Sequence, residues 1–259
     1  MAADFRPTAG RLLLVPNALD LGIEPERLTD VIAIGVLEAA AALRHWVVED
    51  ARSTRAFLKR VHEVTPLCKP LQDIDIQEIP RPRKGSKESI PATEWSRALA
   101  PALAGEDMGL LSEAGLPAVA DPGSALVAAA HRASIAVVVL PGPSSLTLAL
   151  AASGLNGQSF AFIGYLPQEA GARLARLREL EGLSRRLGQT QLVIETPYRN
   201  AALWGALLSS LAPSTELSVS CGLTLAQGWT RSASVERWRQ LPPLELPDKL
   251  PAVFALLAH

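Results

Sequence analysis

The sequence contains little cysteine or histidine, and neither is spaced as metal ligands usually are. Its two cysteines, Cys68 and Cys221, lie far apart and outside any CxxC pattern. The four histidines form neither an HxxxH nor an HExxH pattern. We therefore expect no disulfide framework and no metal site. So few cysteines are typical of a reducing compartment, and we expect a cytoplasmic protein.

Common nucleotide-binding and hydrolase motifs are also absent. No GxGxxG follows a hydrophobic run, and there is no P-loop. The turn GPSSL, at residues 142–146, resembles a nucleophile elbow but lacks the final glycine of GxSxG, and the only later histidine is His259. We therefore expect Ser144 or Ser145 to cap the following helix rather than to act as a nucleophile.

The sequence has no excess of charge of either sign. Its formal net charge is −1, so an RNA ligand would have to meet a local basic patch. One basic run is RPRKGSK at residues 81–87, and a second is an arginine-rich segment at residues 173–186. Its arginines are Arg173, Arg176, Arg178, Arg185 and Arg186. Because Glu179 and Glu181 dilute this segment, we interpret both runs as solvated faces rather than phosphate contacts.

A long stretch without charged residues, between Arg132 and Glu169, could by its length alone span a membrane. The turn Pro141-Gly142-Pro143 and the polar residues at 156–158 divide it into a short strand and a helix. We interpret it as buried α/β core and expect no membrane span. The first residues also lack the apolar run of a signal peptide.

Short apolar segments alternate with helical patterns along the first part of the chain. Strands are predicted over 11–15, 45–48, 108–111 and 135–140, and helices over 31–43, 53–61, 93–103 and 124–133. The proline-punctuated segment 64–89 is predicted to be an exposed loop. In the second part, strands are predicted over 160–165, 192–195, 216–220 and 252–257, and helices over 173–187 and 201–211. The fold class is therefore α/β, with an N-terminal domain at 1–140 built on a parallel sheet and a C-terminal α/β domain at 144–259.

Two acidic segments follow predicted strands of the first domain. EDARSTR, at residues 49–55, follows the second strand, and SEAGLPAVADPG, at residues 112–123, follows the third. Open α/β sheets bind ligands at the carboxyl ends of their strands, which makes both segments candidate binding loops. The alternative for EDARSTR is that Asp50 or Ser53 caps a helix whose arginines are exposed. Asp121 is expected near the N-cap of the next helix.

Several motifs, in this order, resemble those of a known family. They are EDARSTR, SEAGLPAVADPG, PGPSS, GLNGQSFAFIGYLP and TQLVIETPYRN. Together they resemble the tetrapyrrole methylase-like superfamily of S-adenosylmethionine-dependent methyltransferases, in particular its ribosomal RNA small subunit methyltransferase I branch. That branch carries EDTRxTR, SDAGTP…SDPG, PGPSA, GFLP and ESPHR. The resemblance extends from about residue 11 to residue 224.

The resemblance implies two α/β domains with S-adenosyl-L-methionine in the cleft between them, a homodimer, and ribose 2′-O-methylation of small-subunit ribosomal RNA, met free or in a ribosomal particle. The cofactor contacts that it implies are Pro16, Ser112, Glu113, Ala114, Pro117, Ser144, Ser145, Glu195 and Leu223. A hydroxyl acceptor must also lose a proton. Asp50 is the candidate base, and Arg55 is the candidate for orienting a phosphate or carboxylate of the acceptor.

Two departures from the family pattern leave alternatives open. The turn after the first strand is PNALDLG rather than PIGNLGD, so Ala18 or Leu19 could narrow the cofactor site, and CGLTLAQ replaces RELTK. One alternative is a tetrapyrrole C-methyltransferase, although such enzymes usually carry a GGDP-type loop where this chain has SEAG. The other is a non-catalytic paralogue that binds the cofactor or RNA.

Overall fold

The computed structural model describes residues 9–20, 27–80 and 90–259. The chain forms two compact units, Met1–Pro143 and Ser144–His259, and each is described here by itself. The predicted basic run at residues 81–87 lies outside the described residues. Within the described ranges, no helix is long and apolar enough to cross a bilayer.

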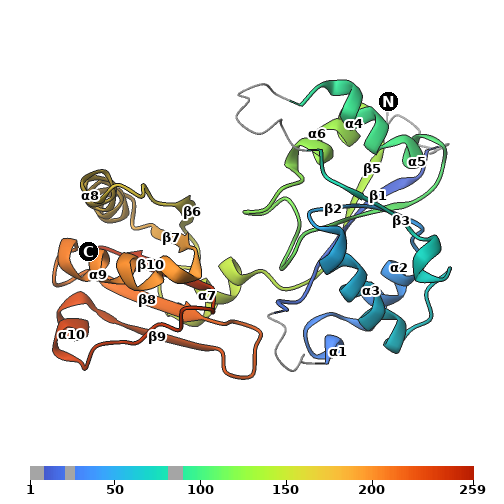
Figure 1. Ribbon diagram of the computed structural model, residues 1–259. Helices are drawn as coiled ribbons and strands as arrows, with labels where there is room; N and C mark the ends of the chain where they lie inside the picture. The colour runs from blue at the N-terminus through green and yellow to red at the C-terminus, as the bar shows by residue number, and fades with distance from the viewer. Residues whose placement is uncertain (1–8, 21–26, 81–89) are drawn as a thin grey trace. The chain divides into compact units, whose positions relative to one another are not determined.

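The first unit is built on a five-stranded parallel sheet with the order β3-β2-β4-β1-β5 (Figure 1). Its strands are β1 (Arg11–Val15), β2 (His45–Val48), β3 (Asp75–Glu78), β4 (Met108–Leu111) and β5 (Ala136–Val139). Four of them coincide with predicted strands because each is a continuous apolar run. Strand β3 was not predicted, because its sequence DIQE is polar and lies in a proline-punctuated segment.

Helices cover both faces of this sheet. On one face lie α1 (Leu28–Val31), α2 (Ile34–Ala41) and α3 (Ala51–Val64), whose buried residues share a cluster with Trp46. On the other lie α4 (Ala92–Ala98), α5 (Ala100–Leu103) and α6 (Ser124–Arg132), packed on Leu12 and Leu110. A 3-10 turn, η1 (Leu71–Asp73), precedes β3. The predicted parallel sheet covered on both faces is therefore confirmed.

Strand β5 differs from the prediction in its surroundings. The segment was interpreted as buried core, but β5 is an edge strand, paired only with β1 among the described strands. Ala136 is exposed, and Val139 exposes 60% of its surface. A parallel edge strand can be as apolar in sequence as a central one, so its composition alone does not reveal its position in the sheet.

The second unit is built on a mixed sheet with the order β6-β7-β10-β8-β9. Its strands are β6 (Phe160–Tyr165), β7 (Thr190–Glu195), β8 (Glu216–Cys221), β9 (Trp229–Ser234) and β10 (Ala252–Leu257). Strands β6 and β7 are parallel, and β10 runs antiparallel to both β7 and β8. The edge strand β9 was not predicted, because its sequence WTRSAS is mostly polar.

Helix α7 (Ser145–Ser153) packs on one face of this sheet through Leu146, Ala149 and Leu150. Helices α8 (Ala170–Leu187) and α9 (Asn200–Ser210) contact each other, and α8 also contacts β7 and β10 (Figure 1). The short helix α10 (Val235–Gln240), also unpredicted, packs beside β9. A 3-10 turn, η2 (Pro197–Arg199), links β7 to α9.

The predicted positions of two helix caps agree with the structure. Ser144 occupies the N-cap position of α7, although its side chain accepts no capping hydrogen bond; its carbonyl oxygen accepts one from the Thr147 hydroxyl at 3.2 Å. Asp121 stands two residues before the N-cap residue of α6, which is Gly123, with φ of 129°. A glycine suits this position because the left-handed backbone is strained for other residues.

Candidate functional site

The carboxyl ends of the strands in the first unit bring together the loops that follow β1 and β4. Asn17, buried directly after β1, donates hydrogen bonds from Nδ2 to the carbonyl oxygens of Ser112 (3.1 Å) and Glu113 (3.0 Å). The main chains of Asn17 and Gly115 exchange two further hydrogen bonds of 2.9 Å. The residues predicted to contact the cofactor at 112–114 therefore form a loop attached firmly to the first strand.

The turn after β5 packs against the loop after β1. A Cβ atom on Gly142 would lie 2.2 Å from Cβ of Pro16. Only a glycine permits this approach, because real Cβ contacts are never so short. Pro16, another predicted cofactor contact, is thus held between its own strand and the PGP turn.

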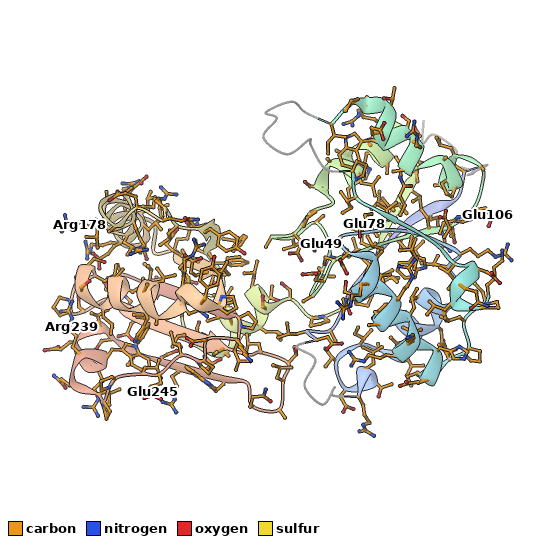
Figure 2. The ribbon with its side chains drawn as sticks, viewed as in Figure 1. Glu49, Glu78, Glu106, Arg178, Arg239 and Glu245 are labelled. Carbon is orange, nitrogen blue, oxygen red and sulfur yellow. The ribbon has the colours of Figure 1, made fainter. Side chains whose placement is uncertain are left out.

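Acidic side chains also lie at the carboxyl ends of the strands in the first unit. Glu49, the first residue after β2, accepts a hydrogen bond at Oε2 from the Glu113 main-chain N–H at 3.2 Å. Figure 2 shows Glu49 beside Glu78, at the ends of neighbouring strands, and Glu106 at the opposite side of the sheet. Negative charge at one end of a sheet favours a cationic ligand there.

Asp121 belongs to this acidic group. Burial, with a smaller contribution from the charges of Glu49 and Glu113, raises its pKa to about 6, although a hydrogen bond with Ser112 acts in the opposite direction. Asp121 therefore titrates close to neutral pH. Nothing in the sequence indicates this burial, because the acid stands in a turn between alanine and proline.

The two candidate catalytic residues of the EDARSTR segment have local contacts within α3. Asp50 accepts a hydrogen bond from the Ser53 main-chain N–H at 2.7 Å, and this bond lowers the pKa of Asp50. The exposed Arg55 donates to the carbonyl oxygen of Ala51 at 3.1 Å. The helix-capping interpretation of Asp50 is confirmed. Catalytic roles for Asp50 and Arg55 stay a prediction.

The altered turn after β1 affects the site at only one of its two unusual residues. Ala18 is 4% exposed and packs in the core with α2 and α3, so it does not narrow a binding site. Leu19 lines a pocket of about 300 Å³. The same pocket is lined by Glu113 and Ala114, two predicted cofactor contacts, and by the polar side chains of Asn17 and Arg60.

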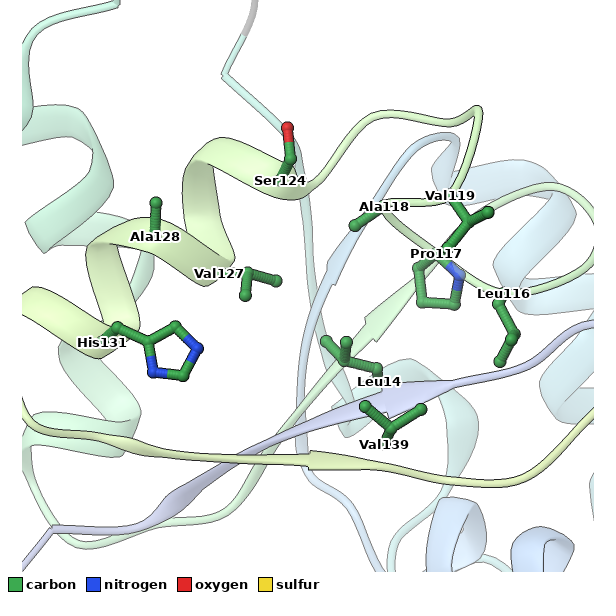
Figure 3. Close-up of a pocket in the computed structure, with 10 residues that line it drawn as sticks. All are labelled: Leu14, Leu116, Pro117, Ala118, Val119, Ser124, Val127, Ala128, His131 and Val139. Atoms are coloured by element: carbon green, nitrogen blue, oxygen red, sulfur yellow. The ribbon is translucent and has the colours of Figure 1, made fainter. Parts of the chain in front are cut away.

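A second, apolar pocket of about 380 Å³ lies between the later part of this loop, helix α6 and strands β1 and β5 (Figure 3). Pro117 lines it, so the predicted cofactor contacts of the first unit are divided between two pockets. Its remaining lining residues are Leu14, Leu116, Ala118, Val119, Ser124, Val127, Ala128, His131 and Val139. Two apolar or mixed pockets along one rigid loop are able to receive different parts of an extended ligand.

In the second unit, the predicted contacts at Glu195 and Leu223 lie at the same end of the sheet. Strands β7 and β8 both run antiparallel to β10, so their carboxyl ends coincide. The Glu195 side chain is only 2% exposed, and its Oε1 accepts bonds from the Thr196 main-chain N–H (2.7 Å) and Arg199 Nη2 (2.7 Å). The half-buried Leu223 packs on the cluster that contains Leu146 at the start of α7. Ser144 and Ser145 directly precede Leu146.

No group of three or more metal-binding side chains occurs in the described part of the chain.

Comparison with known proteins identifies the family. A family model described as "Tetrapyrrole (Corrin/Porphyrin) Methylases" matches residues 24–231. "Ribosomal RNA small subunit methyltransferase I" of Mesorhizobium japonicum is 39% identical over 120 residues, which cover 46% of this chain and 40% of that protein. The protein of the same name from Streptococcus pyogenes is 32% identical over 197 residues, which cover 75% of this chain and 58% of that protein.

The chain thus spans about half the length of the curated relatives it matches. Among solved structures, a uroporphyrin-III C-methyltransferase from Thermus thermophilus, in complex with S-adenosylhomocysteine, has a TM-score of 0.50 at 16% identity, covering 96% of this chain and 97% of that one. At this identity the likeness concerns the fold alone, and it agrees with the two-sheet α/β architecture described above. With more than half of its residues matched by the family model, the chain belongs to the tetrapyrrole (corrin/porphyrin) methylase family.

Proposed function

We propose that the protein is an S-adenosylmethionine-dependent methyltransferase that acts on RNA, by ribose 2′-O-methylation of small-subunit ribosomal RNA. The names of the curated relatives support the RNA acceptor, and the S-adenosylhomocysteine complex of a protein of similar fold supports the cofactor. As further parts of this proposal, the protein is a cytoplasmic homodimer, and its RNA partner is met free or in a small-subunit particle.

The proposed cofactor contacts are those that the motifs indicate. In the first unit they are Pro16, Ser112, Glu113, Ala114 and Pro117, and in the second they are Ser144, Ser145, Glu195 and Leu223. The observation that carries the proposal is the tethered loop 112–115 beside the acidic group of Glu49, Glu113 and Asp121. The cofactor bears a positive sulfonium and a positive ammonium group, and these suit a site with negative charge. The pockets along the loop supply apolar surface for its adenosine.

The cofactor, when bound, supplies an activated methyl group on its sulfonium sulfur. The chain's own residues then have to orient the acceptor hydroxyl, exclude water and receive its proton. Asp50 remains the candidate that the EDARSTR motif indicates, with Arg55 to orient the acceptor. We add Asp121 as a candidate base, because a carboxyl with a pKa of about 6 accepts a proton near neutral pH better than one with a lowered pKa.

A methyl-transfer assay with three acceptors tests the proposal. Purified protein is incubated with methyl-labelled S-adenosylmethionine and either unmethylated small ribosomal subunits, protein-free small-subunit RNA, or uroporphyrinogen III. The proposal predicts label in RNA, recovered after digestion as a 2′-O-methylated nucleoside. Label in the tetrapyrrole alone would establish the alternative acceptor. Cofactor binding without transfer to any of the three would indicate a non-catalytic paralogue.

A further inference from the structure

Both tyrosines of the chain are exposed at one end of the second unit's sheet, where strands β6 and β7 terminate. The sequence contains only two. Tyr165 ends β6 and is 57% exposed, and Tyr198 lies in η2, just after β7, and is 73% exposed. Because β6 and β7 are parallel neighbours, with Tyr165 paired to Ile194, both tyrosines stand at the carboxyl ends of adjacent strands. Large aromatic side chains exposed together are typical of a binding surface.

A β-bulge determines the direction of Tyr165. The register of β6 against β7 shifts between Phe162 and Gly164, and Gly164 has φ of 80°. Phe162 pairs with Leu192, and Tyr165 pairs with Ile194, so both aromatic residues point to the face that α7 covers. Phe162 and Tyr165 are three positions apart, and in a regular strand this odd spacing would place them on opposite faces. Bulges that redirect a side chain in this way are frequent beside functional sites.

Positive charge accompanies the tyrosines. The Arg199 guanidinium lies 5.4 Å from the ring centroid of Tyr198, and Arg199 is held in place by Glu195. Arg173, in the first turn of α8, has a buried Nε with no hydrogen-bond partner among the described residues. Helix α8 carries four further arginines, at positions 176, 178, 185 and 186. Of these, Arg176 is paired with Glu179, and Arg185 donates to the carbonyl oxygen of His259, at the opposite end of the sheet from the tyrosines.

We propose that Tyr165 and Tyr198 form a stacking platform for unpaired RNA bases, with Arg199 and Arg173 near the adjoining phosphates. This inference rests on the proposed function, and it specifies the form of RNA that the site receives. That form is a single-stranded segment whose bases are unpaired and free to stack on protein side chains. Proteins bind such segments by stacking bases on aromatic rings and arginine planes, beside positive charge for the backbone.

The platform lies at the end of the sheet that carries Glu195, a proposed cofactor contact, because Arg199 contacts both Tyr198 and Glu195. A base stacked on Tyr198 would therefore lie near Glu195, where nucleotides flanking the methylated one are expected. A protein partner would also favour exposed tyrosines, but Arg199 beside Tyr198 and Arg173 at the start of α8 favour a polyanion.

The test measures RNA affinity by fluorescence anisotropy of a labelled single-stranded oligonucleotide of about ten nucleotides. The variants are Tyr165→Ala and Tyr198→Ala, with Tyr165→Phe and Tyr198→Phe to keep the ring. Phe160→Ala is the matched control, because Phe160 is 44% exposed at the opposite end of the same strand. Circular dichroism melting and titration with S-adenosylmethionine show whether each variant keeps its fold and its cofactor site.

Each alanine variant is expected to bind the RNA about tenfold more weakly, as loss of one stacked base predicts. The phenylalanine variants and Phe160→Ala keep wild-type affinity, and the KM for RNA rises in the alanine variants while cofactor affinity does not change. The inference is overturned by unchanged RNA affinity in folded alanine variants, by an equal loss in Phe160→Ala, or by absence of RNA binding in the wild type. A wild type that binds RNA through the tyrosines but transfers no methyl group contradicts the proposed function and leaves the platform standing.

Discussion

Replacing Asp121 with asparagine should stabilise the protein near neutral pH and leave it unchanged in acid. Burial raises the pKa of Asp121 from its ordinary value of 3.8 to about 6, so the folded state binds its proton more tightly than the unfolded state does. Stability from this group is therefore complete below about pH 4 and is lost as the pH rises through about 6. The asparagine variant carries no charge at any pH and escapes this loss.

The magnitude follows from the shift of roughly two pKa units. At about 1.4 kcal/mol per unit the limit is roughly 3 kcal/mol. Asp121 is only half-buried, and solvent screening reduces the effect to about 1–2 kcal/mol. Urea unfolding of the wild type and of Asp121→Asn, compared at about pH 4 and near neutral pH, measures the difference.

Asp73→Asn is the control, because Asp73 is exposed in the same unit. A gain in stability for Asp121→Asn that is equal at both pH values, or a loss near neutral pH, would show that the folded state does not raise the pKa of Asp121. Its suitability as a proton acceptor would then also fall.

Three further substitutions test how the loops of the first unit form a cofactor site. Glu113→Lys should weaken S-adenosylmethionine binding about tenfold, as measured by calorimetry. Glu106→Lys, at the opposite side of the sheet, should leave the affinity unchanged. Equal effects of the two substitutions would refute a local role of Glu113 in cofactor binding. Asn17→Ala should cost about 2 kcal/mol of unfolding free energy in urea, because two loop carbonyls lose their donor, and no loss would mean that the loop is held otherwise. Gly142→Ala should lower the free energy of unfolding by about 1–3 kcal/mol, because the added Cβ would lie 2.2 Å from Cβ of Pro16. Gly35→Ala is the control, because Gly35 has open space around it, and it should not lower the free energy of unfolding in the same urea titration.

The sequence predicts the central strands of both sheets but not the polar edge strands. A buried strand such as β4, with the sequence MGLL, must be apolar on both faces, and that pattern is visible without a structure. The edge strands β3 and β9 are held by main-chain hydrogen bonds to one neighbour, and their exposed polar side chains resemble those of a loop. Strand β5 was predicted to be buried but lies at an edge of the sheet, because the apolar sequence of a strand does not reveal its position in the sheet.

The candidate site is predictable in its loops but not in its contacts. The motifs locate residues 112–114 and the strand end at Glu195, because turn residues and acids after apolar strands are visible in sequence. The anchoring by Asn17 and the raised pKa of Asp121 depend on side chains from loops far apart in the chain. The bulge that turns Tyr165 depends on strand register, which no local pattern reveals.

Calorimetric titration of the purified protein with S-adenosyl-L-methionine tests the proposed cofactor site most directly. The tethered acidic loop and its pockets predict saturable binding with a dissociation constant near the micromolar range, or about −8 kcal/mol. Folded protein that takes up no cofactor at millimolar concentration would contradict the cofactor assignment, and with it the methyltransferase proposal.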